Sequence, residues 1–330
     1  MTRSHRPSHS HASSRVSSLA LVIGAIGCAS APATPAPSPA ANAAANTTPA
    51  TRPLVARPQP SIPLWAGGAP GALGADSTDQ PLITPYLPPA GTANGTAVVI
   101  FPGGGYQHLS MVKEGSDVAN WLAGAGVTTF VVRYRLGPKY RHPTMLGDAQ
   151  RAIRTVRARA AEWNVDPRRL GVIGFSAGGH LASTAGTHFD LGNASSADPI
   201  ERASARPDFL LLLYPVITMR DSLTHGGSKR NLIGTDAAPD LVRLMSNETR
   251  VSRDTPPTFL VHSTDDKAVP VENSLLFYEA LKRNGVPAEM HVFEHGGHGF
   301  GLAPRDPVLS AWTTMCEAWM RRHGWLTPVR

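Results

Sequence analysis

The chain has very little cysteine. Only Cys28 and Cys316 occur among its 330 residues. If Cys28 is consumed in processing of the N-terminal segment, Cys316 has no partner, so we expect no intramolecular disulfide even outside the cytoplasm. No cluster of His, Cys and Asp shows the spacing of metal ligands either. The nearest candidate, His295 and His298 in "HGGHG", is too rich in glycine for a helical ligand pair. The sequence therefore predicts no metal and no other cofactor.

The chain also lacks a dense basic cluster and an internal repeat. Its net charge is +7, but the lysines and arginines are scattered along the sequence. The densest group comprises Arg151, Arg154, Arg157 and Arg159, and it lies on a helical pattern. We interpret this group as a solvated helix face rather than a nucleic-acid-binding stripe. No nucleic-acid partner is expected.

Long apolar runs are absent as well. The N-terminal apolar stretch "LALVIGAIG" (19–27) is far too short to span a bilayer, and the basic segment before it contains no acidic residue. This pattern is typical of a secretory signal. The stretch ends in "AIGC", which resembles a bacterial lipobox and makes Cys28 a candidate lipidation site. Ordinary cleavage nearby, for example after Ala31, is the alternative and would give a soluble secreted protein.

We therefore predict a signal peptide of the lipoprotein type over residues 1–28. The protein would be exported to the periplasm or the outer membrane, reaching a membrane only through an N-terminal lipid. Residues 29–60 consist largely of Ala, Pro and Thr, a composition that buries no core and predicts a disordered tether. The remaining segment, 61–330, is long enough for one large domain.

Strand-like and helix-like patterns alternate through this domain. The expected strands are 96–101, running into a glycine loop at 103–105, then 127–136, 169–175, 207–217, 255–266 and 288–295. The expected helices are 115–126, 148–163 with Asp148 as its cap, 177–189, 271–285 and 306–324. Several strands are almost wholly apolar. The pattern predicts an α/β fold with a mostly parallel sheet and helices on both faces.

Polar or glycine-rich residues follow four of the expected strands. They are the glycines at 103–105, Ser176, the "STDD" segment at 263–266 and His298. In parallel sheets, functional groups gather at the carboxyl ends of the strands. We therefore expect these four segments to converge on one edge of the sheet.

Ser176 lies in "GFSAG" (174–178), a G-x-S-x-G pattern that fits the tight strand-to-helix turn of a nucleophile elbow. With 31 glycines, such a pattern arises by chance in roughly one sequence in five, so the five letters alone decide little. A serine becomes nucleophilic only when a base takes its proton, and histidine oriented by a carboxylate does this best.

The sequence offers Asp265 or Asp266 as the carboxylate and His295 or His298 as the base. The order Ser, Asp, His along the chain is that of α/β-hydrolases. From about residue 61 to its end, the chain resembles the α/β-hydrolase superfamily, in particular the bacterial acetylxylan-esterase-like, or xylanase-associated, esterases. The stretches that carry the resemblance are "FPGGGYQHLS", "VVRYRLGPKYRHPTMLGDAQRAIRTVRARA", "GFSAGGHLAST", "LLYPVI", "HSTDDKAVPVENSLLFYEAL" and "FEHGGHGFGL".

The resemblance assigns roles residue by residue. Relatives have D-x-x-V-P after the strand, which selects Asp266, and their "GGHGF" selects His298. The loop "PGGGY" is similar to the HGGG-type oxyanion loop, although Pro102 stands where that motif has histidine. It implies backbone N–H donors from Gly104 and Gly105, joined by Ala177.

Other residues near these motifs are expected to be mostly structural. Tyr106 and Gln107, beside the oxyanion loop, are candidates to line the acyl pocket. His180 is expected to be packed in the core. The irregular stretches 188–207 and 218–255 are expected to form a lid over a substrate cleft.

The resemblance implies a serine carboxylesterase that hydrolyses short-chain acyl esters through an acyl-enzyme, with acetyl groups on xylan-type oligosaccharides as the implied substrate. The expected partner is a small-molecule or oligosaccharide ester. One alternative is a serine peptidase of the prolyl-oligopeptidase type, which needs a propeller domain for which this chain has no room. Another is a non-catalytic binding protein on a hydrolase scaffold. Such proteins typically lose a triad member, whereas this chain retains all three.

Overall fold

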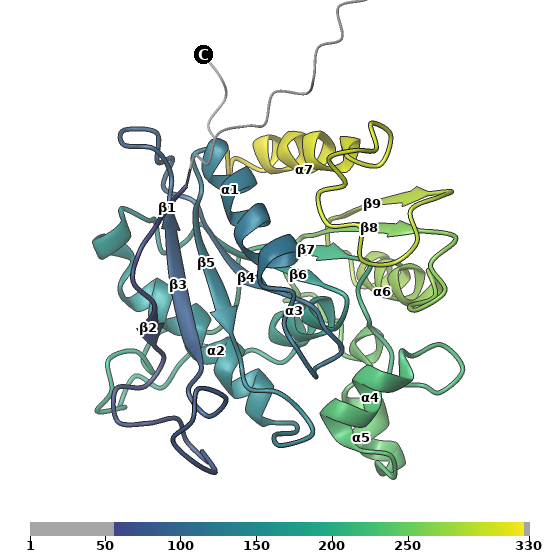
Figure 1. Cartoon of the computed structure of the whole chain (residues 1–330), viewed down its shortest axis with the longest axis horizontal. Coiled ribbons are helices and arrows are strands. Elements are labelled where there is room, and N and C mark those ends of the chain that lie inside the picture. The colour runs from purple at the N-terminus through teal and green to yellow at the C-terminus, as the bar shows by residue number, and fades with distance from the viewer. Residues whose placement is uncertain (1–55, 327–330) are drawn as a thin grey trace, which may run out of the picture. The chain divides into compact units, whose positions relative to one another are not determined.

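A nine-stranded sheet organises the chain in this computed structural model, which describes residues 56–326 (Figure 1). The strands are β1 (Arg57–Pro58), β2 (Ile62–Pro63), β3 (Leu82–Leu87), β4 (Ala97–Phe101), β5 (Thr128–Arg133), β6 (Leu170–Phe175), β7 (Leu210–Leu213), β8 (Thr258–Ser263) and β9 (Ala288–Phe293). Their order is β1-β3-β5-β4-β6-β7-β8-β9, and β2 pairs with β3. All pairs from β5 to β9 are parallel, whereas β3 runs antiparallel to β1, β2 and β5. The expected mostly parallel sheet is confirmed.

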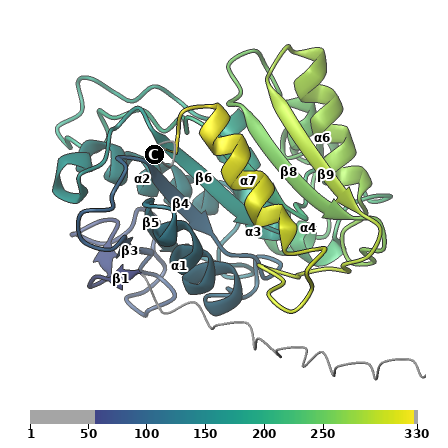
Figure 2. The ribbon, with the colours of Figure 1, turned by 90° about the horizontal axis from the view of Figure 1, so that it is seen from above.

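Helices cover both faces of the sheet. The α-helices are α1 (Asp117–Gly124), α2 (Thr144–Ala158), α3 (Ala177–Thr187), α4 (Gly226–Ile233), α5 (Pro239–Leu244), α6 (Glu272–Arg283) and α7 (Ala311–Arg322). Side chains of α1 and α7 pack on one face and those of α2, α3 and α6 on the other, as the turned view in Figure 2 helps to follow. No helix within residues 56–326 is long and apolar enough to cross a membrane.

The middle strands are buried on both faces. Every residue of β4, β6, β7 and β8 is buried. Alternate residues contribute to the two cores: Val99 and Val172 face α2 and α3, while Val98 and Ile173 face α1 and α7. This double burial explains why these strands are almost continuous apolar runs without a polar alternation.

The sheet includes residues that lie before the expected domain boundary at 61. β1, at Arg57–Pro58, pairs with Tyr86 and Leu87 of β3, so the last residues of the segment 29–60 belong to the sheet rather than to a tether. The rest of that segment and the expected signal peptide at 1–28, including Cys28, lie outside the described residues.

Asp148 does not cap a helix. Helix α2 begins at Thr144, and the carboxylate of Asp148 is fully buried within it. That carboxylate accepts hydrogen bonds from the guanidinium of Arg135 and from its backbone N–H, and the closest ion-pair distance is 2.6 Å. The periodicity identified the helix but placed its start four residues too late, because an acidic residue near a helix start predicts a cap, whereas this side chain is buried against Arg135.

The arginine-rich face of α2 is not solvated either. Arg151 and Arg154 are only 5% and 6% exposed. Together with Arg157 they form ion pairs with the acidic side chains of the loop that follows α3, namely Asp190, Asp198, Glu201 and Asp208. Most of the stretch 188–207 therefore packs over α2 instead of forming a lid. Of the four arginines, Arg159 has the most exposed side chain, at 31%, and it pairs with Glu162.

Candidate active site

Ser176 occupies a strained turn between β6 and α3. Its φ is 52°, in the left-handed region that side chains rarely adopt. The flanking glycines permit this turn. A Cβ at Gly174 would lie 2.2 Å from the carbonyl oxygen of Gly178, and one at Gly178 would lie 2.1 Å from that of Phe101. The G-x-S-x-G spacing is thus a steric requirement of the turn in this chain.

The turn brings Ser176 against the loop after β9. Ser176 Oγ lies 2.8 Å from His298 Nε2, and His298 Nδ1 lies 2.7 Å from Asp266 Oδ2. Because the carboxylate can only accept, Nδ1 carries the ring proton, and Nε2 is left to accept from the serine hydroxyl. The three residues chosen from the sequence come together in an arrangement that can move a proton from serine to histidine.

Asp266 is fixed in the turn after β8. Its Oδ1 accepts hydrogen bonds from the backbone N–H groups of Ala268 and Val269, both at 2.9 Å. Its Oδ2 faces His298 and also lies 3.3 Å from Nε2 of the buried His262. Burial acts to raise the pKa of this carboxyl. The hydrogen bonds from His262, His298 and Val269 outweigh it and hold the pKa well below its usual range. Asp266 is therefore ionised and oriented.

The neighbouring aspartate and histidine lie elsewhere. The side chain of Asp265 faces the loop that carries His298, where its Oδ1 accepts a hydrogen bond from Gly297 N–H at 2.8 Å. His295 is 80% exposed at its side chain and lies 3.5 Å from Asp265. Asp265 supports the loop, and His295 does not reach Ser176 in this arrangement.

In the glycine loop after β4, one backbone N–H is hydrogen-bonded and two are available to bind a ligand. Gly103 N–H donates to Glu114 Oε2 at 2.8 Å and is not free for a ligand. No hydrogen bond within the described residues uses the N–H of Gly104 or Gly105. Ala177 is the first residue of α3, where the backbone N–H has no partner inside the helix. These three N–H groups are the candidates for stabilising an oxyanion beside Ser176.

Glu114 connects the oxyanion loop with the histidine loop. It is 5% exposed; Oε2 accepts from Gly103, and Oε1 accepts from the Tyr214 hydroxyl at 2.8 Å. The same hydroxyl accepts from Gly301 N–H at 3.0 Å, three residues after His298, and the rings of Tyr214 and His298 meet edge to face. Burial raises the pKa of Glu114, against the opposing effect of its hydrogen bonds. Nothing in the sequence singled out this residue, since it lies just before the expected helix 115–126 and outside every motif.

A cavity of about 380 Å³ opens over these groups. Ser176, His298, Glu114, Gly104 and Gly105 line it. In residues 56–326 no three His, Cys, Asp or Glu side chains come together as a metal ion would require.

One of the two expected lid segments reaches this cavity. His225 and Asn231, from the stretch 218–255, line its wall, and Asn231 Nδ2 donates to the carbonyl oxygen of Gly105 at 2.8 Å. The described residues lining the cavity include none from 188–207. Both segments have an irregular composition, which neither revealed the helices α4 and α5 in 218–255 nor told which segment packs over the site.

Tyr106 does not line an acyl pocket, and this expectation is corrected. Its side chain is fully buried beneath the loop, where its hydroxyl lies 2.8 Å from His180 Nδ1. His180 Nε2 lies 2.8 Å from the carbonyl oxygen of Met245, so His180 is a core residue as expected. Gln107 is exposed and does line the Ser176 cavity. Adjacent positions of this loop point in opposite directions, one into the core and one to the cavity.

Comparisons with known proteins agree with this arrangement. The model of the BD-FAE family matches residues 84–281, a span that contains Ser176 and Asp266. The chain is 37% identical to an acetylxylan esterase of Xylanibacter ruminicola over 213 residues, 63% of this chain and 42% of that protein. It is 35% identical to endo-1,4-beta-xylanase B of Butyrivibrio fibrisolvens over 221 residues, 66% of this chain and 34% of that protein. The chain thus spans less than half the length of these curated relatives.

A solved structure is similar over most of the domain. It is that of an acetyl ester-xyloside bifunctional hydrolase from Caldicellulosiruptor lactoaceticus, which is 46% identical with a TM-score of 0.77. The similarity covers 81% of this chain and 97% of that one. The sheet, the elbow and these matches lead to one assignment: the chain is an α/β-hydrolase and belongs to the BD-FAE family.

Proposed function

We propose that this protein is a serine carboxylesterase that hydrolyses short-chain acyl esters, with acetyl groups on xylan-type oligosaccharides as its substrate. The observation that carries the proposal is the hydrogen-bonded chain from Ser176 through His298 to Asp266, with distances of 2.8 and 2.7 Å. It lies beside backbone N–H groups that no other described group uses. This combination suits acyl transfer from an ester to water.

The first half of the reaction forms an acyl-enzyme. Ser176 Oγ attacks the ester carbonyl carbon while its proton passes to His298 Nε2. The resulting imidazolium is stabilised by Asp266 through the Nδ1 proton. The tetrahedral oxyanion accepts hydrogen bonds from the N–H groups at 104, 105 and 177. His298 then gives its proton to the departing alcohol oxygen, and the carbon–oxygen bond to the alcohol breaks.

The second half of the reaction hydrolyses the acyl-enzyme and regenerates the free serine. Water loses a proton to His298 Nε2 as its oxygen attacks the acyl carbon. The second tetrahedral intermediate uses the same backbone donors. His298 then protonates Ser176 Oγ as the acid leaves. No step requires a group beyond the residues of this chain and water.

The choice of substrate rests on the relatives. The matched region is shared with proteins named acetylxylan esterase and acetyl ester-xyloside bifunctional hydrolase. An esterase of Mycobacterium tuberculosis, Esterase LipC, is 30% identical over 217 residues. These names favour ester hydrolysis over the peptidase alternative. A binding protein on an inactive scaffold is disfavoured by the intact hydrogen-bonded triad.

A series of p-nitrophenyl esters from C2 to C12, run beside acetylated xylo-oligosaccharides, tests the proposal. A methylene that the cavity accepts contributes about 0.8 kcal/mol, whereas one that it cannot accept costs roughly 1–3 kcal/mol. We expect kcat/KM to be highest for C2 to C4 and to fall more than about tenfold by C8. We also expect the enzyme to release acetate from the acetylated xylo-oligosaccharides. A steady rise to C10 or C12 would instead indicate a lipase-like enzyme.

We also propose that residues 1–28 direct export and that Cys28 becomes a lipidated N-terminus. The support is the basic segment, the short apolar stretch and "AIGC" in the sequence. Globomycin, or the substitution Cys28→Ala, should block processing and membrane association. Unchanged partition into the soluble periplasmic fraction would favour ordinary signal cleavage.

A further inference from the structure

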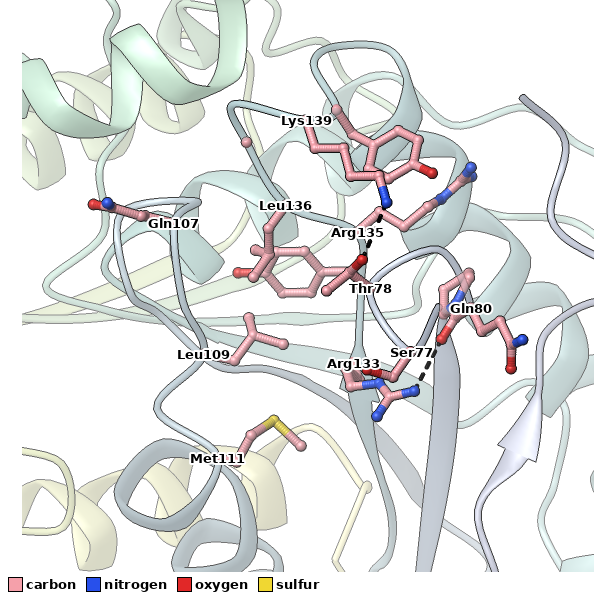
Figure 3. Close-up of a pocket in the computed structure, with 14 residues that line it drawn as sticks. Ser77, Thr78, Gln80, Gln107, Leu109, Met111, Arg133, Arg135, Leu136 and Lys139 are labelled. Atoms are coloured by element: carbon pink, nitrogen blue, oxygen red, sulfur yellow. Dashed lines mark hydrogen bonds between the residues drawn. The ribbon is translucent and has the colours of Figure 1, made fainter. Parts of the chain in front are cut away.

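A second cavity, of about 320 Å³, adjoins the one that contains Ser176 (Figure 3). Its walls come from three places: the segment before β3, the loop after β4 and the end of β5 with the segment that follows. Gln107 lines both cavities, so the two meet at that residue. The volume lies within the range of small-molecule sites. The mechanism described above uses nothing in this second cavity.

The sheet register places the second cavity close to the reacting serine. Ile100 of β4 is paired with Val131 of β5 on one side and with Ile173 of β6 on the other. Arg133, at the carboxyl end of β5, therefore lies nearly level with Ser176, which follows β6. The two strands are separated by two strand spacings, about 10 Å. One substrate molecule of modest size can occupy both cavities.

Three basic side chains line the second cavity, and two of them are neutralised. Arg135 forms the buried ion pair with Asp148. Lys139 forms an ion pair of 2.6 Å with the buried Asp79. Because Arg135 and Lys139 already have carboxylate partners in the protein, neither is available as the counter-ion of a bound ligand.

Arg133 differs from them. It forms no ion pair with any of residues 56–326. One Nη donates to the carbonyl oxygen of Gln80 at 3.2 Å, and Nε is buried without a hydrogen-bond partner among these residues. The other Nη–H donors of Arg133 have no partner among these residues, and the two Nη groups of a guanidinium can bind a carboxylate through two parallel hydrogen bonds.

The other walls suit a sugar ring. Leu109, Met111 and Leu136 present partly buried apolar surface, which can cover the C–H face of a ring. The exposed amide of Gln107 offers donors and an acceptor for hydroxyl groups. Figure 3 shows Leu109, Met111 and Gln107 on one side of the cavity and Arg133 and Gln80 on the other.

We propose that this cavity binds an acidic sugar unit on the alcohol side of the ester, with Arg133 as the counter-ion of its carboxylate. A short acyl group fits in the cavity next to Ser176 and is too small to extend past Gln107. The part of the substrate that reaches the second cavity is therefore the alcohol. This inference rests on the proposed esterase function and adds to it a preference for substrates that carry negative charge.

The test uses two matched acetyl esters, one of methyl glucuronoside and one of methyl glucoside, which differ only in a carboxylate against a hydroxymethyl group. The ratio of their kcat/KM values is measured for the wild type and for Arg133→Gln, Arg133→Lys and Arg168→Gln. Arg168 is an exposed arginine just before β6, at the opposite edge of the sheet, and its substitution removes the same charge.

We expect the wild type to favour the anionic ester by about tenfold or more, the effect of a charge-assisted hydrogen-bond pair. Arg133→Gln should abolish this preference, Arg133→Lys should retain part of it, and Arg168→Gln should leave it unchanged. Equal rates for the two esters in the wild type, or an unchanged ratio in Arg133→Gln, would overturn the inference.

Calorimetry separates this inference from the proposed function. Binding of methyl glucuronoside and of methyl glucoside to Ser176→Ala, with and without Arg133→Gln, requires no turnover. If neither ester is hydrolysed, the esterase proposal fails, whereas glucuronoside binding that depends on Arg133 still supports the cavity assignment. Equal binding of the two sugars, or glucuronoside binding that Arg133→Gln does not weaken, contradicts it.

Discussion

The backbone N–H of Gly103 donates a hydrogen bond of 2.8 Å to the buried carboxylate of Glu114. This contact holds the first glycine of the loop, so that the N–H groups of Gly104 and Gly105 remain available next to Ser176. The second oxygen of Glu114 accepts from Tyr214, which in turn accepts from the loop carrying His298. One carboxylate thus supports two sides of the site without touching the reacting atoms.

Glu114→Gln should lower kcat by about tenfold to a hundredfold while KM changes little, because an amide cannot accept from both Gly103 and Tyr214. Steady-state kinetics on a short-chain ester measures this split. Glu279→Gln, at an exposed carboxylate on α6 that pairs with Arg283, is the matched control. Wild-type kcat in a folded Glu114→Gln variant would show that the loop does not depend on this residue.

The adjacent aspartates should respond differently to the same substitution. Asp266→Asn removes the acceptor for the His298 Nδ1 proton and should reduce kcat by about a thousandfold or more. Asp265→Asn keeps an oxygen to accept from Gly297 N–H and should have a far smaller effect. Comparable losses would mean that both residues orient the histidine, and the reverse order would exchange their roles.

His180 should make the fold sensitive to mild acid. Burial lowers its pKa from 6.5 to about 4, so the unfolded chain binds the proton more readily than the folded one. Its contribution is present above pH 6.5 and is lost progressively as the pH falls from about 6.5 to about 4, by about 3 kcal/mol in total. Urea unfolding at pH 7 and pH 4.5 should therefore show a smaller loss for His180→Gln than for the wild type. Identical pH dependence in the two proteins would contradict this assignment.

Two ion pairs in and just after α2 should differ sharply in their contribution to stability. Asp148→Asn leaves Arg135 buried without its counter-ion and should lower the free energy of unfolding by about 3–5 kcal/mol. Glu162→Gln breaks the partly exposed pair with Arg159 and should cost less than about 1 kcal/mol. Urea unfolding at pH 7 measures both. Similar losses for the two variants would contradict a larger stabilising effect of the buried Asp148–Arg135 pair.

The parts of this structure that the sequence predicted are those with local physical causes. Continuous apolar strands predict a parallel sheet, and the glycines around Ser176 are required by its turn. The parts it missed depend on contacts between distant segments. The partner of Asp148, the loop that covers Arg154 and the burial of Tyr106 are all set by tertiary packing. A helical pattern shows which face of a helix is apolar, but it does not show which loop will cover the polar face.

The antiparallel strand β3 and the helices α4 and α5 were also absent from the sequence-based prediction. β3 contains Pro85, which weakens a strand pattern, and the two helices are short enough to be formed mainly by their packing. Yet α4 supplies Asn231 to the cavity wall. The details that shape substrate choice are thus the ones least visible in the sequence.

Covalent labelling of Ser176 tests the central claim most directly. An organophosphonate should react once per chain, and peptide mass spectrometry should place the adduct on Ser176 alone. Ser176→Ala should take up no label, keep its fold and lose at least about a thousandfold in kcat. Labelling of a different serine, or a Ser176→Ala variant that retains a tenth of the wild-type activity, would contradict the account.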